Sequence, residues 1–152
     1  QGLVAATVLG LTLAAGSAAA SPYPLAEIMK KEMAEKLAKH DVTTSDQLLE
    51  RAARAKQRRQ LAKKAGIPAR RLFRWVKMCD LLRIKGVGPE MVRLLEAGRV
   101  TTVRQLKGRK ARRLHGRLMK ANKKARVTDN PPDVKQVAAW IEQARKLPAK
   151  LR

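Results

Sequence analysis

The side chains that carry most protein chemistry are scarce in this chain of 152 residues. One cysteine, Cys79, cannot form an internal disulfide, and the two histidines, His40 and His115, lack the spacing of a metal site. Aromatic residues make up only 3%, which argues against a platform that stacks the bases of a single strand. The few acids form no paired-carboxylate motif. We therefore expect neither an enzyme nor a bound cofactor or metal.

Acidic residues are the second shortage. The chain has 12 Asp and Glu against 35 Lys and Arg, which gives a net charge of +23. No acid lies between Glu50 and Asp80, where eleven Lys and Arg occur, or between Glu96 and Asp129, where twelve occur. A charge run is usually a solvated face, but a surface that serves only solubility mixes both signs. The imbalance therefore predicts a polyanionic partner: nucleic acid, anionic lipid or an acidic wall polymer.

We expect these two acid-free runs to contact the polyanion through their most clustered cations. The candidates in the first run are Arg58, Arg59, Lys63 and Lys64. The candidates in the second run are Arg109, Lys110, Arg112, Arg113 and Arg117. If the two halves of the chain stack with pseudo-symmetry, these residues form one or two continuous basic faces.

Charged side chains are absent altogether from residues 1–26. An apolar run over 3–15 is followed by small residues, with Ala18 and Ala20 spaced as a signal-peptidase site. We expect residues 1–20 to be a signal-peptide-like leader, and the exported protein, periplasmic or extracellular, to begin near Ser21. A membrane anchor is the rival interpretation, although the second half of this segment is only weakly apolar.

Strand patterns are missing as well. No stretch alternates convincingly between apolar and polar residues, and apolar residues recur instead at helical spacing. Trp75 and Trp140 both lie on such apolar faces, so we expect core anchors rather than base-stacking residues. The sequence predicts an all-α domain over 21–152, with helices at about 25–39, from Thr44, and at about 57–65, 68–83, 89–97, 107–126 and from Asp133.

One stretch organises the rest of the chain: Lys85-Gly86-Val87-Gly88-Pro89, between two amphipathic helices. Its glycines can take a positive φ or let another backbone approach, and the proline suits the first position of a helix. The free amides at that helix end favour an anion. The pattern is typical of a helix-hairpin-helix motif that grips a phosphate; a turn used only for packing is the alternative. The candidate residues are Arg83, Lys85, Gly86, Val87, Gly88, Glu90, Met91 and Arg93.

The chain also repeats itself. The segment 42–48 matches 100–106, and each copy offers a capping box, Thr44 with Gln47 and Thr102 with Gln105. We therefore divide the domain into two halves, 21–82 and 83–152. The first half has no glycine pair in its hairpin and is two residues shorter there. We expect this degenerate hairpin to keep its packing role, or to continue as helix, and to lose the phosphate grip.

With the hairpin and the repeat in view, the chain resembles a bacterial family of tandem helix-hairpin-helix proteins catalogued as a domain of unknown function. The resemblance implies an all-helical fold of tandem hairpins in one compact domain, and DNA contact that is independent of sequence. The chain departs from the family in its degenerate first hairpin, its basic composition and its export-like leader. The resemblance covers nearly all of 23–148 and rests on 23–25, 34–37, 42–44, 83–88, Leu114-His115, 140–144 and 146–148.

We therefore expect a non-enzymatic protein that binds double-stranded nucleic acid, DNA more than RNA. Base sequence should not matter, because phosphate contacts position a protein without reading bases. Two alternatives stay open. One is a protein-interaction or scaffolding module of packed hairpins, and the other is an exported cationic protein that binds anionic lipid or wall polymer.

Overall fold

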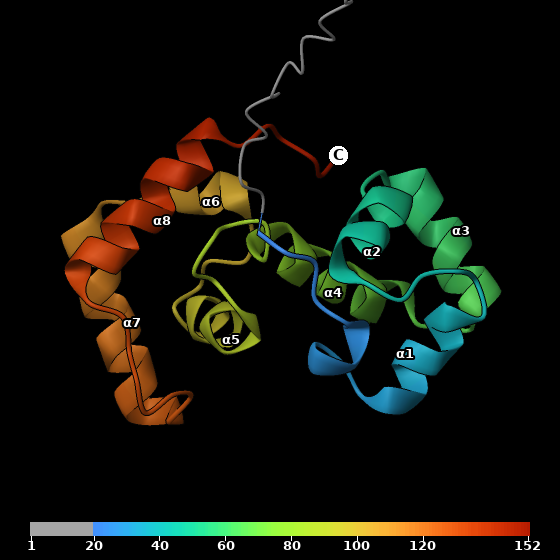
Figure 1. Cartoon of the computed structure of the whole chain (residues 1–152), viewed down its shortest axis with the longest axis horizontal. Helices are drawn as coiled ribbons and strands as arrows, with labels where there is room; N and C mark the ends of the chain where they lie inside the picture. The colour runs from blue at the N-terminus through green and yellow to red at the C-terminus, as the bar shows by residue number, and fades with distance from the viewer. Residues whose placement is uncertain (1–19) are drawn as a thin grey trace, which may run out of the picture.

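The computed structural model describes residues 20–152, and these residues form helices, turns and no strand (Figure 1). The predicted all-α class is confirmed for this part of the chain. A short 3-10 helix, η1, precedes eight α-helices. The elements are η1 (Leu25–Glu27), α1 (Lys31–Ala38), α2 (Ser45–Ala52), α3 (Ala55–Ala65), α4 (Ala69–Leu81), α5 (Pro89–Ala97), α6 (Val103–Lys107), α7 (Ala111–Ala125) and α8 (Val134–Lys146).

The helices gather into two groups, which we call the first lobe (η1 and α1–α4) and the second lobe (α5–α8). In the first lobe α2 packs against α3 and α4, and in the second α7 packs against α5 and α8 while α6 packs against α8. Figure 1 shows the first lobe on the right and the second on the left, with α4 running toward α5, which is seen end-on. Apolar side chains at helical spacing explain this packing: Trp75 and Val76 of α4 and Trp140 and Ile141 of α8 are buried, as expected of core anchors.

The two lobes share backbone detail where their sequences match. Asp41 and Arg99 both take a left-handed conformation, with φ of 61° and 63°. The next residue then donates its N–H back to a leucine carbonyl, Val42 to Leu37 and Val100 to Leu95. Each segment therefore leaves its first helix through the same turn.

Of the three predicted helix caps, one forms completely, one forms in part and one does not form. Asp133 caps α8 as predicted, with a full capping box to Gln136. Thr102 accepts the N–H of Gln105, but the Gln105 side chain bonds the N–H of Thr101 rather than that of Thr102. The box at Thr44 is wrong, because its hydroxyl bonds Asp46 and makes no capping bond.

The predicted first helix at 25–39 is also wrong. The chain forms η1, turns through Ile28, Met29 and Lys30, and only then begins α1. Both Ile28 and Met29 are buried, and Lys30 has extended backbone angles of −61° and 142°, which a helix cannot accommodate. A real turn therefore stands before α1. Other boundaries shift by less: α3 begins at Ala55, α4 ends at Leu81, and the basic region 107–126 is divided between the end of α6 and α7.

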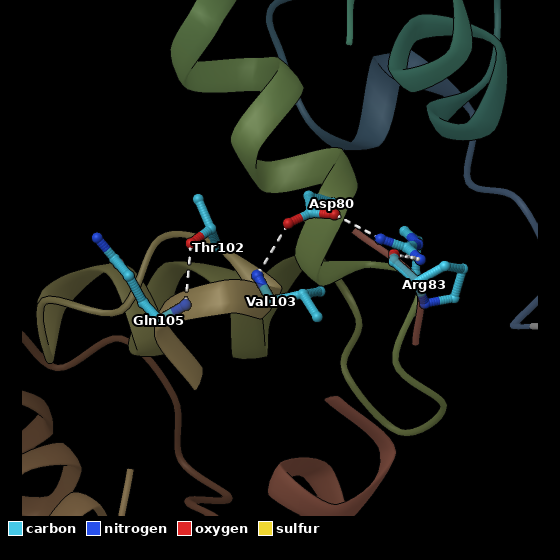
Figure 2. A network of polar contacts seen from close by, with 6 residues as sticks. Asp80, Arg83, Thr102, Val103 and Gln105 are labelled. Carbon is cyan, nitrogen blue, oxygen red and sulfur yellow. Dashed lines mark hydrogen bonds and ion pairs between the residues drawn. The ribbon is translucent and has the colours of Figure 1, made fainter. Parts of the chain in front are cut away.

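One buried acid joins the two lobes. Asp80, at the end of α4, is 3% exposed and accepts the N–H of Val103 at 2.9 Å with one carboxylate oxygen. The other oxygen receives the Arg83 guanidinium at 2.7 Å (Figure 2). Arg83 also donates to the carbonyl of Pro148, in the segment after α8. This segment crosses back to the first lobe, where Arg152 exchanges backbone hydrogen bonds with Ala53 and Ala55.

The predicted leader falls on residues 1–20, of which the structure describes only Ala20. None of the helices within 20–152 has both the length and the apolar character that a membrane crossing needs. Cys79 lies free and buried on the core face of α4, as its spacing predicted.

Candidate nucleic-acid interface

The turn between α4 and α5 has the backbone that its glycines predict. Gly86 takes a φ of +89°, a conformation that side-chain-bearing residues rarely adopt. Val87 is fully buried beneath the turn and donates its N–H to Ile84 at 3.0 Å. Gly88 caps α5, and Pro89 is the first residue of that helix. Lys85, Gly86 and Glu90 are exposed, so the outer edge of the turn faces solvent while its apolar centre faces the core.

Four backbone amides of this turn have no hydrogen-bond acceptor among the described residues. These amides sit at the N-terminus of α5, where the partial positive charge of the helix adds to their own. Unpaired N–H groups that reach solvent at a helix start are suited to an anion. They belong to Gly86, Gly88, Glu90 and Met91.

Two aromatic side chains lie against the glycines. A Cβ at Gly86 would stand 3.2 Å from the indole nitrogen of Trp140, and a Cβ at Gly88 would stand 3.3 Å from the hydroxyl of Tyr23. Neither polar group has a hydrogen-bond partner within residues 20–152, although no buried side-chain nitrogen or oxygen there is unsatisfied. Both groups therefore stand beside the turn without an acceptor in the described chain, Trp140 in a residue that is only 4% exposed and Tyr23 in a half-buried one. They add two donors to the amides.

A glutamine side chain holds the turn against α8. Gln143 accepts the N–H of Lys85 at 2.9 Å and donates to the carbonyl of the same residue at 3.0 Å. This two-bond contact fixes the backbone immediately before the glycines. The turn is therefore positioned by the last turns of α8 as well as by α4.

The charged residues around the turn have different roles. Lys85 is exposed and makes no ion pair within the described chain. Arg83 is only 15% exposed and is held by Asp80 and Pro148, so its guanidinium is committed to the joint between the lobes. Arg93 donates to the carbonyl of Glu27 and ties α5 to η1. The exposed carboxylate of Glu90 lies at the start of α5 and opposes an anion there.

The second basic run gathers on one side of α7. Arg109, Lys110, Arg113 and Arg117 line a single small depression of about 20 Å³ above the buried Leu114. Arg113 and Arg117 are four residues apart on α7 and share a helix face. Arg109 and Lys110 precede the helix, and the Arg109 guanidinium donates to the carbonyl of Arg99 at 3.4 Å. Arg112 is exposed but does not line this depression. We call these four cations the α7 cluster.

The glycine turn and the end of α6, which leads into the α7 cluster, both bond the last turns of α8. Gln143 bonds Lys85 of the turn, and two residues later Arg145 donates to the carbonyl of Lys107, the last residue of α6. Two features predicted separately from the sequence therefore belong to one lobe.

The first basic run lies apart from this region. In Figure 1 α3 is at one end of the long axis and α7 is at the other, so the two runs form separate patches. Arg59, Lys63 and Lys64 are exposed on α3. Arg58 is not free: one of its nitrogens donates to the carbonyls of Ala52 and Ala53. Of the predicted one or two basic faces, this arrangement fits two separate ones rather than a single continuous face.

Comparison with protein families gives one result. Residues 27–147 match the domain described as "Domain of unknown function (DUF4332)". The chain belongs to this family. Comparison with curated proteins and with solved structures gives no match. The DUF4332 assignment supports the predicted kinship with a family of unknown function and leaves its activity to be argued from the site itself.

Some residues of this DUF4332 domain that shape the site carry only weak signals in the sequence. Gln143 looks like an ordinary polar residue of α8, and the Tyr23 hydroxyl lies 65 residues ahead of the glycine it meets. Asp80 offered the best clue, because a carboxylate among the apolar residues of α4 needs a partner.

Proposed function

We propose that this protein binds double-stranded nucleic acid, DNA in preference to RNA, without regard to base sequence, through the second lobe. The glycine turn would seat one phosphate as a helix-hairpin-helix motif does, and the α7 cluster would hold the backbone by charge. The first turn, before α1, would be a degenerate hairpin that serves packing alone. No catalytic step is part of the proposal.

The observation that carries the proposal is the convergence of unpaired donors at the turn. Four backbone amides, the Trp140 indole and the Tyr23 hydroxyl all lack acceptors in the described chain, and Lys85 stands beside them. Donors of this kind match the oxygens of a phosphate and carry no information about base sequence. The α7 cluster adds four cations on the same lobe, whose exposed acids are Glu90, Asp129, Asp133 and Glu142, the last of which is already paired with Arg145.

The expected salt dependence of binding differs between the α7 cluster and the glycine turn. Each phosphate neutralised on duplex DNA adds about −0.9 to the slope of log affinity against log salt. The α7 cluster and Lys85 together would therefore give a slope of about −4 to −5, whereas neutral amide donors change it little. Charge would set the affinity, and the turn would set the geometry.

A packing role for the glycines is the competing explanation, and the contacts to Trp140 and Tyr23 favour it in part. A bulky residue at either glycine would collide with these rings, so a simple glycine replacement cannot separate folding from binding. Gly88 offers a cleaner test. Its φ of −90° suits alanine, and the three atoms nearest to an added Cβ all belong to Tyr23, with the hydroxyl the closest at 3.3 Å.

The experiment compares Tyr23→Phe with the double variant Tyr23→Phe/Gly88→Ala in a salt-titrated duplex DNA binding assay. Removing the hydroxyl leaves room for the methyl group, so both variants should fold equally, which circular dichroism and urea unfolding would check. We expect the methyl group to block close approach of the phosphate and to lower affinity about tenfold, with an unchanged salt slope. Equal affinity of the two variants would assign the glycines to packing.

Two further substrates test the alternatives. Anionic vesicles and an acidic polymer should bind with a similar salt dependence but should not respond to the added methyl group. A scaffolding module should show little affinity for any of the three polyanions.

Export is a separate part of the proposal and rests on the composition of residues 1–20. A chain with an intact leader, expressed in a bacterium, should appear outside the cytoplasm with Ser21 near its N-terminus. Intact mass of the recovered protein measures this directly.

A further inference from the structure

We propose that a cavity between the two lobes binds a 5′-nucleotide. The cavity has a volume of about 620 Å³ and is bounded by α3, α4, α6 and the segment after α8. It is a different site from the glycine turn, and it does not depend on the function proposed above.

Hydrogen bonds hold the walls of the cavity in place. Asp80 fixes the start of α6 on one side and Arg83 on the other, as Figure 2 shows. Arg83 in turn holds Pro148 at 2.7 Å, and the two backbone bonds between Arg152 and residues 53 and 55 secure the far end of the segment. Both lobes and the C-terminal segment therefore contribute fixed walls.

The lining is strongly cationic. Its one acid, Asp80, is already paired with Arg83 at 2.7 Å. The cationic side chains that remain make no ion pair within residues 20–152, so the space carries a large uncompensated positive charge. Such a cavity favours a ligand with more than one negative charge, as a phosphate monoester has. These side chains are Arg58, Arg104, Lys107, Lys150 and Arg152.

One wall of the cavity is aromatic. Phe73 is the one large apolar side chain that is exposed in the described chain, at 37%, and it lines this space. The Arg58 guanidinium lies 4.0 Å from the centre of the Phe73 ring and is held by the carbonyls of Ala52 and Ala53. Arg58 thus covers one face of the Phe73 ring, and the Lys77 ammonium lies 5.1 Å from the centre of the same ring. The outer plane of the Arg58 guanidinium, held from behind by Phe73, is the surface on which a base would stack. Aromatic rings and guanidinium planes both stack on nucleobases.

Size and chemistry together select the ligand. The volume falls within the range of small-molecule sites, about 300 to 1,000 Å³, and excludes a double helix. A phosphate alone would leave the aromatic wall unused, and an uncharged ring would leave the cations unused. A 5′-nucleotide satisfies both, either as a free molecule or as the phosphorylated end of a strand.

Isothermal titration calorimetry with adenosine 5′-monophosphate tests the proposal on the whole chain, with adenosine and inorganic phosphate as separate probes. We expect the nucleotide to bind at least tenfold more tightly than either part. The variants Phe73→Leu and Arg104→Gln/Lys107→Gln should each weaken it about tenfold. The double variant Lys123→Gln/Lys124→Gln, on exposed α7 positions outside the cavity, removes the same charge and should change affinity less than twofold.

A second arm identifies the source of the ligand. A duplex with a 5′-phosphate should outbind the same duplex with a 5′-hydroxyl if strand ends are recognised, and the two should bind equally if free nucleotides are. The proposal is overturned if neither the nucleotide nor a phosphorylated end binds. It is also overturned if the lysine control weakens binding as much as the cavity variants do. Loss of nucleotide binding on Phe73→Leu with duplex affinity intact would separate this site from the glycine turn.

Discussion

The turn before α1 and the turn before α5 stand at matching places in the two lobes. Both bury an apolar residue under the turn, Met29 in the first and Val87 in the second, and both lead through an extended residue into a helix. Only the second has a residue at positive φ, Gly86, and only the second contains glycines. The two turns therefore share their packing and differ in their backbone, and only the second has the glycines on which the proposed phosphate site rests.

The first backbone N–H of α2 and that of α6 also have different partners in the two lobes. In the first lobe, Ser45 and Tyr23 exchange hydrogen bonds at 2.8 and 3.0 Å. In the second lobe, the equivalent N–H of Val103 goes to the carboxylate of Asp80, which also binds Arg83. A neutral contact in one lobe is thus replaced by a charged one that, through Arg83, reaches the C-terminal segment. The second lobe gains a rigid joint where the proposed nucleotide cavity lies.

The largest expected effect is a loss of duplex DNA affinity when charge is removed from the α7 cluster rather than from α3. Replacing Arg109, Arg113 and Arg117 with Gln removes three cations of the α7 cluster. The salt slope should become shallower by about 2.7, and duplex DNA affinity should fall on the order of a hundredfold or more at 0.1 M salt. The measurement is fluorescence anisotropy across a salt series.

The matched control replaces Arg59, Lys63 and Lys64 of α3 with Gln. It removes the same charge from the first lobe and should lower affinity by less than tenfold. Equal losses in the two triple variants would mean that net charge, rather than the second lobe, determines binding.

The second prediction compares the joints at α2 and α6 by their stability. Asp80→Ala leaves the Arg83 guanidinium and the Val103 amide without a partner in a buried place, and should lower the free energy of unfolding by about 3 kcal/mol. Ser45→Ala removes one neutral hydrogen bond and should cost about 1 kcal/mol. Urea unfolding measures both. A smaller loss at Asp80 than at Ser45 would contradict the role of the joint.

Much of this architecture could be predicted from sequence, and the failures have clear causes. Pro89 to Ala97 forms a helix as expected, because proline, apolar spacing and a terminal glycine all agree there. The first helix was mispredicted because Ile28 and Met29 continue a helical pattern, whereas in the structure the chain turns at these residues and buries both side chains. The roles of Arg58 and Arg83 could not be predicted, since their acceptors are backbone carbonyls and, for Arg83, also Asp80. Local sequence patterns thus predict most of the helices. They do not predict which cations stay free, because that depends on acceptors far away in the sequence.

The third prediction concerns Cys79 of α4. When Trp75 of α4 is aligned with Trp140 of α8, the residue of α8 that corresponds to Cys79 is Ala144. Burial, aided by the negative charges of Asp80 and Asp46, raises the pKa of Cys79 to about 12 from its ordinary 9.0. An unfolded chain ionises this thiol near pH 9 and the folded chain does not, so the contribution to stability is full below pH 9 and decreases above it. We expect Cys79 to lower the free energy of unfolding by about 1 kcal/mol between pH 8 and pH 10.

The control is Cys79→Ala, which makes the two helices alike at this position. The drop in stability between pH 8 and pH 10 should be smaller in this variant by that amount. A thiol reagent at pH 8 should also label the native protein only as fast as the first lobe opens. Immediate labelling would show that the thiol is accessible.

The smallest effect concerns the acids that begin the helices after each turn, Glu90 of α5 and Glu32 of α1. Glu90→Gln removes the carboxylate that opposes an anion at the glycine turn, and should raise duplex affinity about two- to fivefold at low salt. Glu32→Gln removes the same charge beside the turn before α1 and should leave duplex affinity unchanged. Anisotropy titrations at 50 mM salt would resolve the difference, and equal gains would again point to net charge.

The most direct test follows backbone amide signals by nuclear magnetic resonance while a short duplex DNA is added. If the glycine turn seats a phosphate, the amide protons of Gly86, Gly88, Glu90 and Met91 should shift downfield together, and those of Ile28, Met29 and Lys30 should stay in place. Shifts confined to the lysine- and arginine-bearing helices, with the glycine amides unmoved, would contradict the account.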